Sequence, residues 1–195
     1  DWSSDVCSSD LVREAERAGG EVARAYCLLV VDGAHAYSHF PFKLTDFDAD
    51  FYLILAGDHL YRMNYAELVA AHRTSGADIT IAAQPVAPDT ATQMGIFCFD
   101  TSGNIVAFEE KPNAERLRAI GRSIPPKATF ASHSDDQPFM ASMGIYVFSR
   151  RVMLDLLETQ PGHDFGRELI PAALEHYRVK PYLYRDRKST RLNSS

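Results

Sequence analysis

The six consecutive apolar residues at positions 51–56, FYLILA, limit the possible folds of this chain more than any other feature. Because the run has no polar face, it is typical of a central β-strand that helices cover on both sides. It stops at Gly57-Asp58, a pair that favours a turn. The run therefore predicts a sheet that is buried between helices.

Strand-like and helix-like segments alternate along the rest of the chain. Asn64, with Glu67 three residues later, predicts the start of a helix that Gly76 ends. Ser149 is expected to cap another helix, and a further helix is expected over 169–176. Strands are predicted at 27–31, 79–82, 95–99, 105–108, 142–148 and 179–184, with a hairpin joining 95–99 to 105–108. This alternation favours an α/β fold built on a mixed, largely parallel sheet.

The composition excludes several classes of protein. The chain has 195 residues, of which 46% are apolar, which is enough for one domain with a buried core. Its net charge of −6 argues against a general binder of nucleic acids or acidic membranes. No apolar run approaches the roughly 18 residues of a membrane-spanning helix. Because Cys7, Cys27 and Cys98 form no Cys-x-x-Cys pair, we expect reduced thiols in a soluble, cytoplasmic protein.

The two ends of the chain differ in composition from its middle. Residues 1–12 begin with a stretch rich in Ser and Asp, and residues 187–195 are polar without an apolar period. We expect both to be non-native additions outside a domain that spans 13–186, with ordinary native tails as the alternative. The polar, Pro-containing stretch at 121–138 is expected to be a loop.

The first candidate site is Gly57-Asp58, directly after the apolar strand. Ligands of open α/β sheets bind beyond the carboxyl ends of the strands. A glycine there lets a phosphate approach the backbone closely, and a carboxylate offers the hard oxygen ligand that Mg²⁺ prefers. The alternative is that Asp58 only begins the turn into the next helix.

The second candidate site is Glu109-Glu110-Lys111-Pro112, at the end of a predicted strand. A lysine is a compact positive charge for a phosphate, and a carboxylate can accept hydrogen bonds from sugar hydroxyls. Pro112 favours an extended Lys111 whose side chain projects from the strand end. A solvated turn is the alternative.

Asp164, in His163-Asp164-Phe165-Gly166, is the third candidate, and a helix N-cap is its alternative. The tripeptide Asp-Phe-Gly also occurs in protein kinases, but the chain has no Gly-rich kinase loop and no His-Arg-Asp segment, which excludes a kinase. His59 and His72 lack a helical metal-ligand spacing, so we expect them to be surface or core residues.

Five segments resemble, in family order, the glucose-1-phosphate adenylyltransferases, which are sugar nucleotidyltransferases. They are LILAGDHLYRMNY at 53–65, SGADITI at 75–81, FEEKP at 108–112, ASMGIYVF at 141–148 and HDFGRELIP at 163–171. The likeness covers roughly residues 48–186. It implies a Rossmann-like nucleotidyltransferase domain that converts ATP and α-D-glucose 1-phosphate into ADP-glucose and pyrophosphate, a step of glycogen or starch synthesis.

The resemblance also implies a role for each matching residue. Asp58 matches the catalytic, metal-binding aspartate, and Asp164 is taken as the second carboxylate on the same Mg²⁺. Glu110 and Lys111 match the pair that holds glucose 1-phosphate, and Lys111 is also counted as a catalytic group. Further substrate contacts are implied for Ser142 and Gly95, the latter preceded by Met94 where the family has Phe.

Three features of the family have no counterpart in the sequence: its Gly-rich opening segment, the segment before the strand that leads into Gly57-Asp58, and the C-terminal β-helix domain. The resemblance therefore implies an internal fragment of the catalytic domain of a homotetrameric enzyme, poorly active by itself. The alternatives are a sugar-1-phosphate nucleotidyltransferase that uses dTTP, UTP or GTP, a non-catalytic regulatory subunit of the same fold, and a generic α/β binding module.

Overall fold

The computed structural model describes residues 49–55, 63–101, 104–121, 123–124, 136–160 and 164–184. The strand expected at 27–31, both tails, the Gly57-Asp58 turn and much of the loop expected at 121–138 lie outside the described residues.

One long strand, β5 (Phe139–Ser149), organises the sheet. β2 (Ile79–Val86) borders one edge of β5 along its whole length. The other edge is shared by β1 (Phe51–Leu55), which pairs with residues 145–149, and β3 (Gly95–Phe99), which pairs at Ala141. β4 (Ile105–Glu110) lies beyond β3, and β6 (Val179–Leu183) lies beyond β2. The strands expected within the described residues, including the hairpin, are confirmed.

The expected α/β class and mixed sheet are confirmed. Most strands do run in one direction, as a largely parallel sheet requires, but strands that are hydrogen-bonded neighbours are mostly antiparallel. β1, β2, β3 and β6 run in one direction, whereas β5 lies between them in the opposite direction. Among the described ladders of named strands, only that between β2 and β6 is therefore parallel. Hydrophobic patterning could not reveal this arrangement, because burial on both faces does not depend on the direction of a strand.

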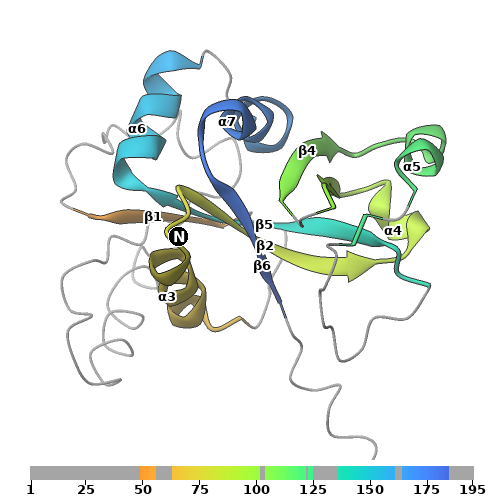
Figure 1. Ribbon diagram of the computed structural model, residues 1–195, viewed down its shortest axis with the longest axis horizontal. Helices are drawn as coiled ribbons and strands as arrows, with labels where there is room; N and C mark the ends of the chain where they lie inside the picture. The colour runs from red at the N-terminus through yellow and green to blue at the C-terminus, as the bar shows by residue number, and fades with distance from the viewer. Residues whose placement is uncertain are drawn as a thin grey trace, which may run out of the picture.

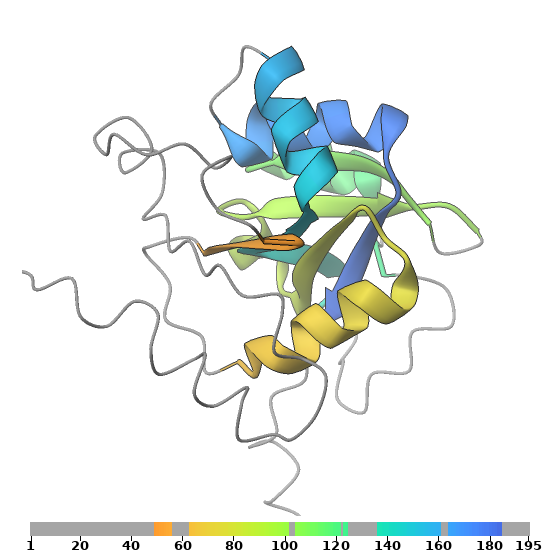
Figure 2. The same cartoon turned by 90° about the vertical axis from the view of Figure 1, so that its left-hand side faces the viewer.

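Helices cover both faces of the sheet (Figures 1 and 2). α6 (Arg150–Thr159) and α7 (Ile170–His176) lie on one face, and α3 (Tyr65–Ser75) lies on the other. The short helices α4 (Pro88–Ala91) and α5 (Ala114–Ile120) lie near the β3–β4 hairpin, and the π-helix η3 (Phe165–Leu169) leads into α7. Alternate residues of β1 accordingly enter different cores, with Tyr52 on the α6 side and Leu53 against Leu68 of α3. Within the described ranges, no helix is long and apolar enough to cross a membrane.

The ends of α3 are where the sequence predicts them. The side chain of Asn64 accepts hydrogen bonds from the N–H groups of Ala66 and Glu67, at 3.1 and 3.3 Å. Gly76 ends the helix with a φ of 61°, a conformation that glycine adopts without strain. Ser149 does precede α6, but its side chain makes no capping hydrogen bond and lies instead 3.2 Å from Nε2 of His72.

Candidate active site

Five of the six predicted site residues lie in the described part of the chain: Gly95, Glu110, Lys111, Ser142 and Asp164. Asp58, the sixth, lies outside the described residues. The five come from four places that are distant in sequence, namely the start of β3, the end of β4, the first half of β5 and the residue before η3.

Strand register brings three of these residues together. Gly95 lies directly opposite Glu110 in the β3–β4 ladder. In the β3–β5 pair Ile96 lies opposite Ala141, and continuing that register by one residue places Gly95 opposite Ser142. Gly95 therefore stands between the two other predicted substrate contacts, on adjacent strands.

A bulge in β5 lies next to this group. Ile81 of β2 pairs with Tyr146, whereas Ala83 pairs with Ser142, so β5 contains two residues more than β2 over this interval. Gly144 within the bulge has a φ of 69°, which requires a glycine for an unstrained backbone, and its N–H donates to Oγ of Ser142 at 3.2 Å. The last residue of β1, Leu55, pairs with Ile145. The carboxyl end of β1 and the start of β3 therefore meet β5 on either side of this bulge.

The carboxylate of Glu110 is enclosed by backbone. A Cβ atom added to Gly95 would lie 2.8 Å from Oε2 of Glu110, and one added to Gly166 would lie 2.6 Å from the same oxygen. Partial burial raises the pKa of Glu110; Lys111 and Arg167 oppose this rise, and the negative charge of Asp164 adds to it. Glu110 is thus a half-buried carboxylate beside charged neighbours, which is the environment of many functional carboxylates.

The carboxylate of the preceding residue, Glu109, is held in an ion pair instead. Arg116 of α5 donates to it through Nε, at 3.0 Å from Oε2, and through its terminal nitrogen. Because successive residues of a strand point to opposite faces, this ion pair occupies Glu109 and leaves Glu110 on the face of Gly95 and η3.

The backbone of Lys111 is not extended, so the expectation drawn from Pro112 is wrong. Its φ is 49°, in the left-handed region, although Pro112 follows it. The N–H of Lys111 donates to the carbonyl of Met94 at 3.1 Å, and this tertiary hydrogen bond holds the chain in a turn at the end of β4. A non-glycine residue in this region costs about 1–2 kcal/mol, and such strain is concentrated at functional sites. The side chain itself is exposed.

Asp164 is the N-cap of η3, which is the alternative that the sequence analysis gave for this residue. Its Oδ1 accepts hydrogen bonds from the N–H groups of Gly166 and Arg167, both at 2.9 Å. Its own N–H donates to Oε2 of Glu168 at 3.1 Å, which completes a reciprocal cap. Both bonds use Oδ1, and no hydrogen bond given between described residues uses Oδ2 of this exposed carboxylate.

Tyr146 and Phe165 belong to the same neighbourhood, and the sequence analysis did not select either as a site residue. Tyr146 is 8% exposed, and its hydroxyl is hydrogen-bonded to Ser142. Burial raises the pKa of Tyr146 to about 12, so the phenol is neutral near pH 7. Its ring stacks on Phe165 of η3, with centroids 5.8 Å apart. The available signal was the alternation of β5, which places Ser142 and Tyr146 on one face of the strand.

The described residues contain no group of three or more His, Cys, Asp or Glu side chains that could hold a metal ion. A cation at this site would therefore need Asp58, substrate oxygens or water in addition to Asp164. The pairing of Asp58 with Asp164 on one cation stays a prediction, because Asp58 lies outside the described residues.

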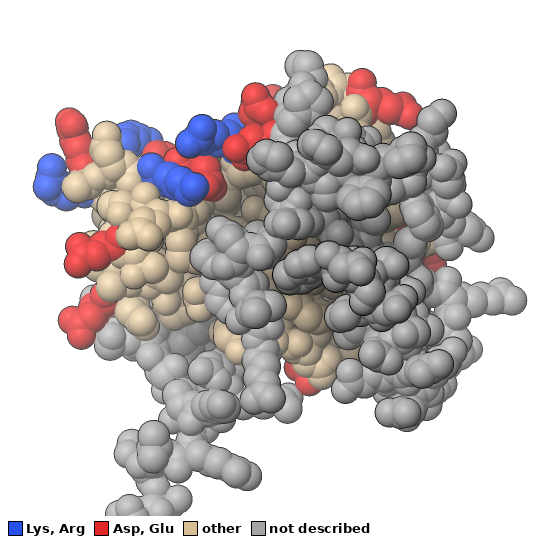
Figure 3. Space-filling view, turned by 180° about the vertical axis from the view of Figure 1, so that it is seen from behind, with Lys and Arg blue, Asp and Glu red and all other residues tan. Residues whose placement is uncertain are grey.

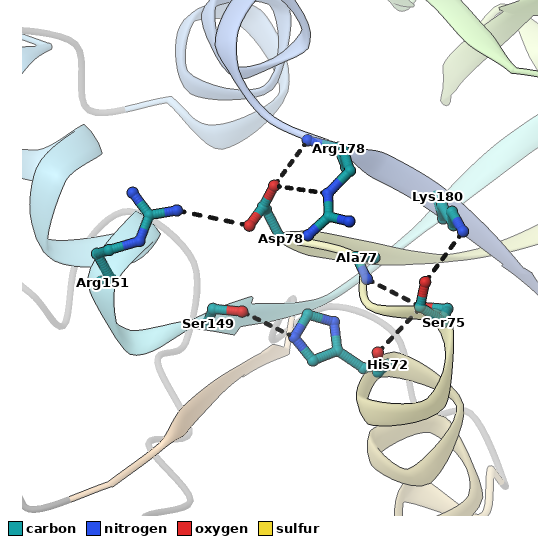
Figure 4. A network of polar contacts seen from close by, with 8 residues as sticks. All are labelled: His72, Ser75, Ala77, Asp78, Ser149, Arg151, Arg178 and Lys180. Atoms are coloured by element: carbon teal, nitrogen blue, oxygen red, sulfur yellow. Dashed lines mark hydrogen bonds and ion pairs between the residues drawn. The ribbon is translucent and has the colours of Figure 1, made fainter.

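A second polar network lies at the opposite end of these strands, where β2 and β6 begin and β5 ends (Figure 4). Asp78 accepts hydrogen bonds from the N–H and Nε of Arg178, at 3.0 and 3.4 Å, and lies 3.6 Å from Arg151. His72 is 1% exposed, with Nδ1 at 2.8 Å from Oγ1 of Thr80. Burial lowers the pKa of His72 to about 4, although the charge of Asp78 opposes the shift. His72 is thus a neutral core residue, as expected for it, and the network joins α3 to the sheet.

Charges of both signs are mixed on the described part of one face of the molecule. Figure 3 shows Lys and Arg residues beside Asp and Glu residues along the upper margin of the molecule. In this view the described residues form no extended surface of one sign.

Comparison with known proteins agrees with the resemblance found in the sequence. The family model described as nucleotidyl transferase matches residues 10–188, which extends the likeness further toward the N-terminus than residue 48. The small subunit of glucose-1-phosphate adenylyltransferase, chloroplastic/amyloplastic, from Triticum aestivum is 48% identical over 136 residues. That alignment covers 68% of this chain and 29% of the relative, so the chain spans less than a third of the relative's length. Because the family match covers most of the sequence, the chain belongs to the nucleotidyl transferase family.

Proposed function

We propose that this chain provides part of the active site of an enzyme that transfers the adenylyl group of ATP to α-D-glucose 1-phosphate. The single observation that carries the proposal is the convergence of Gly95, Glu110 and Ser142 at one place on the sheet, next to the strained Lys111. The identity of 48% to an adenylyltransferase subunit supports this choice of reaction within the family.

The chemistry of each side chain fits a sugar phosphate. Lys111 supplies an exposed positive charge for the phosphate, which a chain of net charge −6 needs locally. Glu110 offers carboxylate oxygens to sugar hydroxyls, and Ser142 offers a hydroxyl to the sugar or its phosphate. Gly95 leaves room for a substrate beside the strand.

The protein forms no covalent bond to the substrates in the transfer step. A phosphate oxygen of glucose 1-phosphate attacks the α-phosphorus of ATP and forms a new P–O bond. The bond from that phosphorus to the bridging oxygen of the β-phosphate breaks, and pyrophosphate leaves with the electron pair. The chain therefore contributes mainly by orientation and by charge, with Lys111 holding the nucleophilic phosphate in line.

We propose that Asp58 and Asp164 hold a Mg²⁺ ion. Asp164 fits this role because it is exposed and because its cap uses only Oδ1. Leu55 pairs with Ile145, three residues from Ser142, and three Cα–Cα steps of about 3.8 Å keep Asp58 within about 11 Å of Leu55. When bound, the ion would neutralise phosphate charge during the transfer.

Other properties of the whole enzyme remain proposals. We favour ATP over dTTP, UTP or GTP because the relative is named an adenylyltransferase. We favour a catalytic chain over a regulatory subunit because Asp58, Lys111 and Asp164 are all present. A homotetrameric enzyme in the cytoplasm stays our expectation, although the wheat relative is named for the chloroplast and amyloplast.

Calorimetric titration of the chain with glucose 1-phosphate in the presence of Mg²⁺ tests the proposal. We expect saturable heat, and we expect Lys111→Ala to weaken the affinity by about tenfold or more, the typical value of a charged hydrogen bond. Lys180→Ala is the matched control, because Nζ of Lys180 donates to the carbonyl of Ser75 in the distant network. A folded chain without saturable heat, or equal weakening by both lysine variants, would contradict the proposal.

A further inference from the structure

We propose that Gly166 is a positioning residue, whose missing side chain leaves the space in which the carboxylate of Glu110 is held. The effect of this contact on substrate rests on the proposed function, whereas the contact itself does not.

The inference rests on the position of one carboxylate oxygen, Oε2 of Glu110. Oε2 of Glu110 lies 2.6 Å from the position that a Cβ atom of Gly166 would occupy, and the carboxyl carbon lies 3.0 Å from it. The same Oε2 lies 2.8 Å from the corresponding position at Gly95. Real Cβ atoms essentially never approach other atoms to less than 3.0 Å. The carboxylate therefore occupies a slot between two glycines, one on β3 and one on η3.

The local structure of η3 explains why Gly166 reaches Glu110. Asp164 caps the π-helix through the N–H of Gly166, which fixes the first turn of η3 at the end of β4. Gly166 is buried there, and its ideal Cβ would meet no residue other than Glu110 among its nearest atoms. π-Helical turns frequently occur at functional sites, where they place a residue that a regular helix would place elsewhere.

The two glycines of the slot differ in what a side chain would disturb. A Cβ atom at Gly95 would also lie 2.1 Å from the ring of Phe108, which belongs to the core, so an alanine there would disturb the fold. At Gly166 the three atoms nearest to the added Cβ all belong to the flexible side chain of Glu110, and the φ of Gly166 is not in the left-handed region. Alanine is also the better residue in a helix. Nothing in the backbone requires a glycine at 166, so the space for Glu110 is its distinguishing feature.

Gly166→Ala would therefore move the carboxylate and leave the fold intact. An ordinary contact of 3.4 Å requires Oε2 to shift by about 0.8 Å. Because misplacement of a reacting or binding group by about 1 Å can cost on the order of 10²-fold, we expect the affinity for glucose 1-phosphate to fall by about tenfold or more.

Thermal unfolding without any ligand tests the slot itself. In a Glu110→Ala background, Gly166→Ala should raise the Tm by about 2–4 °C, the effect of replacing a helical glycine. In the wild-type background the rise should be smaller or absent, because Glu110 must move. Equal Tm changes in the two backgrounds would overturn the proposed contact.

Titration with glucose 1-phosphate and Mg²⁺ tests the positioning role. Gly166→Ala should weaken binding in the wild-type background, but should have little effect in a Glu110→Asp background, where the shorter side chain leaves room for the methyl group. Equal weakening in both backgrounds would overturn the role. If the wild-type chain binds no glucose 1-phosphate, the proposed function fails, while the Tm comparison still decides whether Gly166 holds Glu110.

Discussion

Protonation of His72 should destabilise the fold between pH 6.5 and pH 4. The imidazole is 1% exposed and lies between hydroxyl groups of Thr80 and Ser149, with the ring of Phe51 nearly perpendicular to it at a centroid distance of 5.0 Å. Its pKa falls from 6.5 to about 4 because burial disfavours the charged form. The unfolded chain therefore takes up a proton near pH 6.5, whereas the folded chain does so only near pH 4.

The sign and size of the effect follow from this difference. Above pH 6.5 both states are neutral at His72 and the residue contributes no pH dependence. As the pH falls toward 4, protonation favours the unfolded state by about 1.4 kcal/mol per pH unit, or about 3 kcal/mol in total.

Urea unfolding of the wild-type chain and of His72→Gln at several pH values measures the effect. The free energy of unfolding of the wild type should fall by about 3 kcal/mol more than that of the variant between pH 7 and pH 4. His176→Gln is the control, because His176 is exposed on α7. Parallel pH profiles for the wild type and His72→Gln would show that protonation of His72 does not destabilise the fold.

The other predictions concern the site and α3. In a full-length enzyme of the family that carries these segments, Lys111→Ala should raise the KM for glucose 1-phosphate by about 10- to 100-fold and that for ATP much less, since a charged hydrogen bond contributes about 1.5–3 kcal/mol; equal effects in steady-state kinetics would remove Lys111 from the phosphate site. In the same enzyme, Asp58→Asn should lower kcat with an unchanged Tm, because it removes a ligand used in the transition state; near-normal turnover would defeat that assignment. Asn64→Ala should cost about 1 kcal/mol of stability in urea unfolding, since it removes the cap of α3; a loss below about 0.3 kcal/mol would show that the cap contributes little.

Local chemistry made the helix ends and the hairpin predictable from sequence. Asn64 and Gly76 act through hydrogen bonds and backbone angles within one turn, so their effect does not depend on distant residues. Ser149 shows the limit of such rules, because its hydroxyl lies against His72 from another element instead of capping α6.

Features of the site that depend on tertiary structure could not be predicted. The extended conformation expected of Lys111 was wrong because its N–H bonds to Met94, on the adjacent strand end. The sequence did not show that Glu109 pairs with Arg116 while Glu110 enters the slot beside Gly166. The resemblance identified which residue types matter, but only the register of the strands places Gly95 between Glu110 and Ser142.

Crystallography of the chain with Mn²⁺ and glucose 1-phosphate tests the proposed cation and sugar-phosphate sites together, because the anomalous signal of Mn²⁺ locates the cation. We expect one anomalous peak bonded to carboxylate oxygens of both Asp58 and Asp164, with the sugar phosphate between Lys111, Glu110 and Ser142. A peak on only one of the two aspartates, or a sugar phosphate bound away from Glu110 and Lys111, would contradict this expectation.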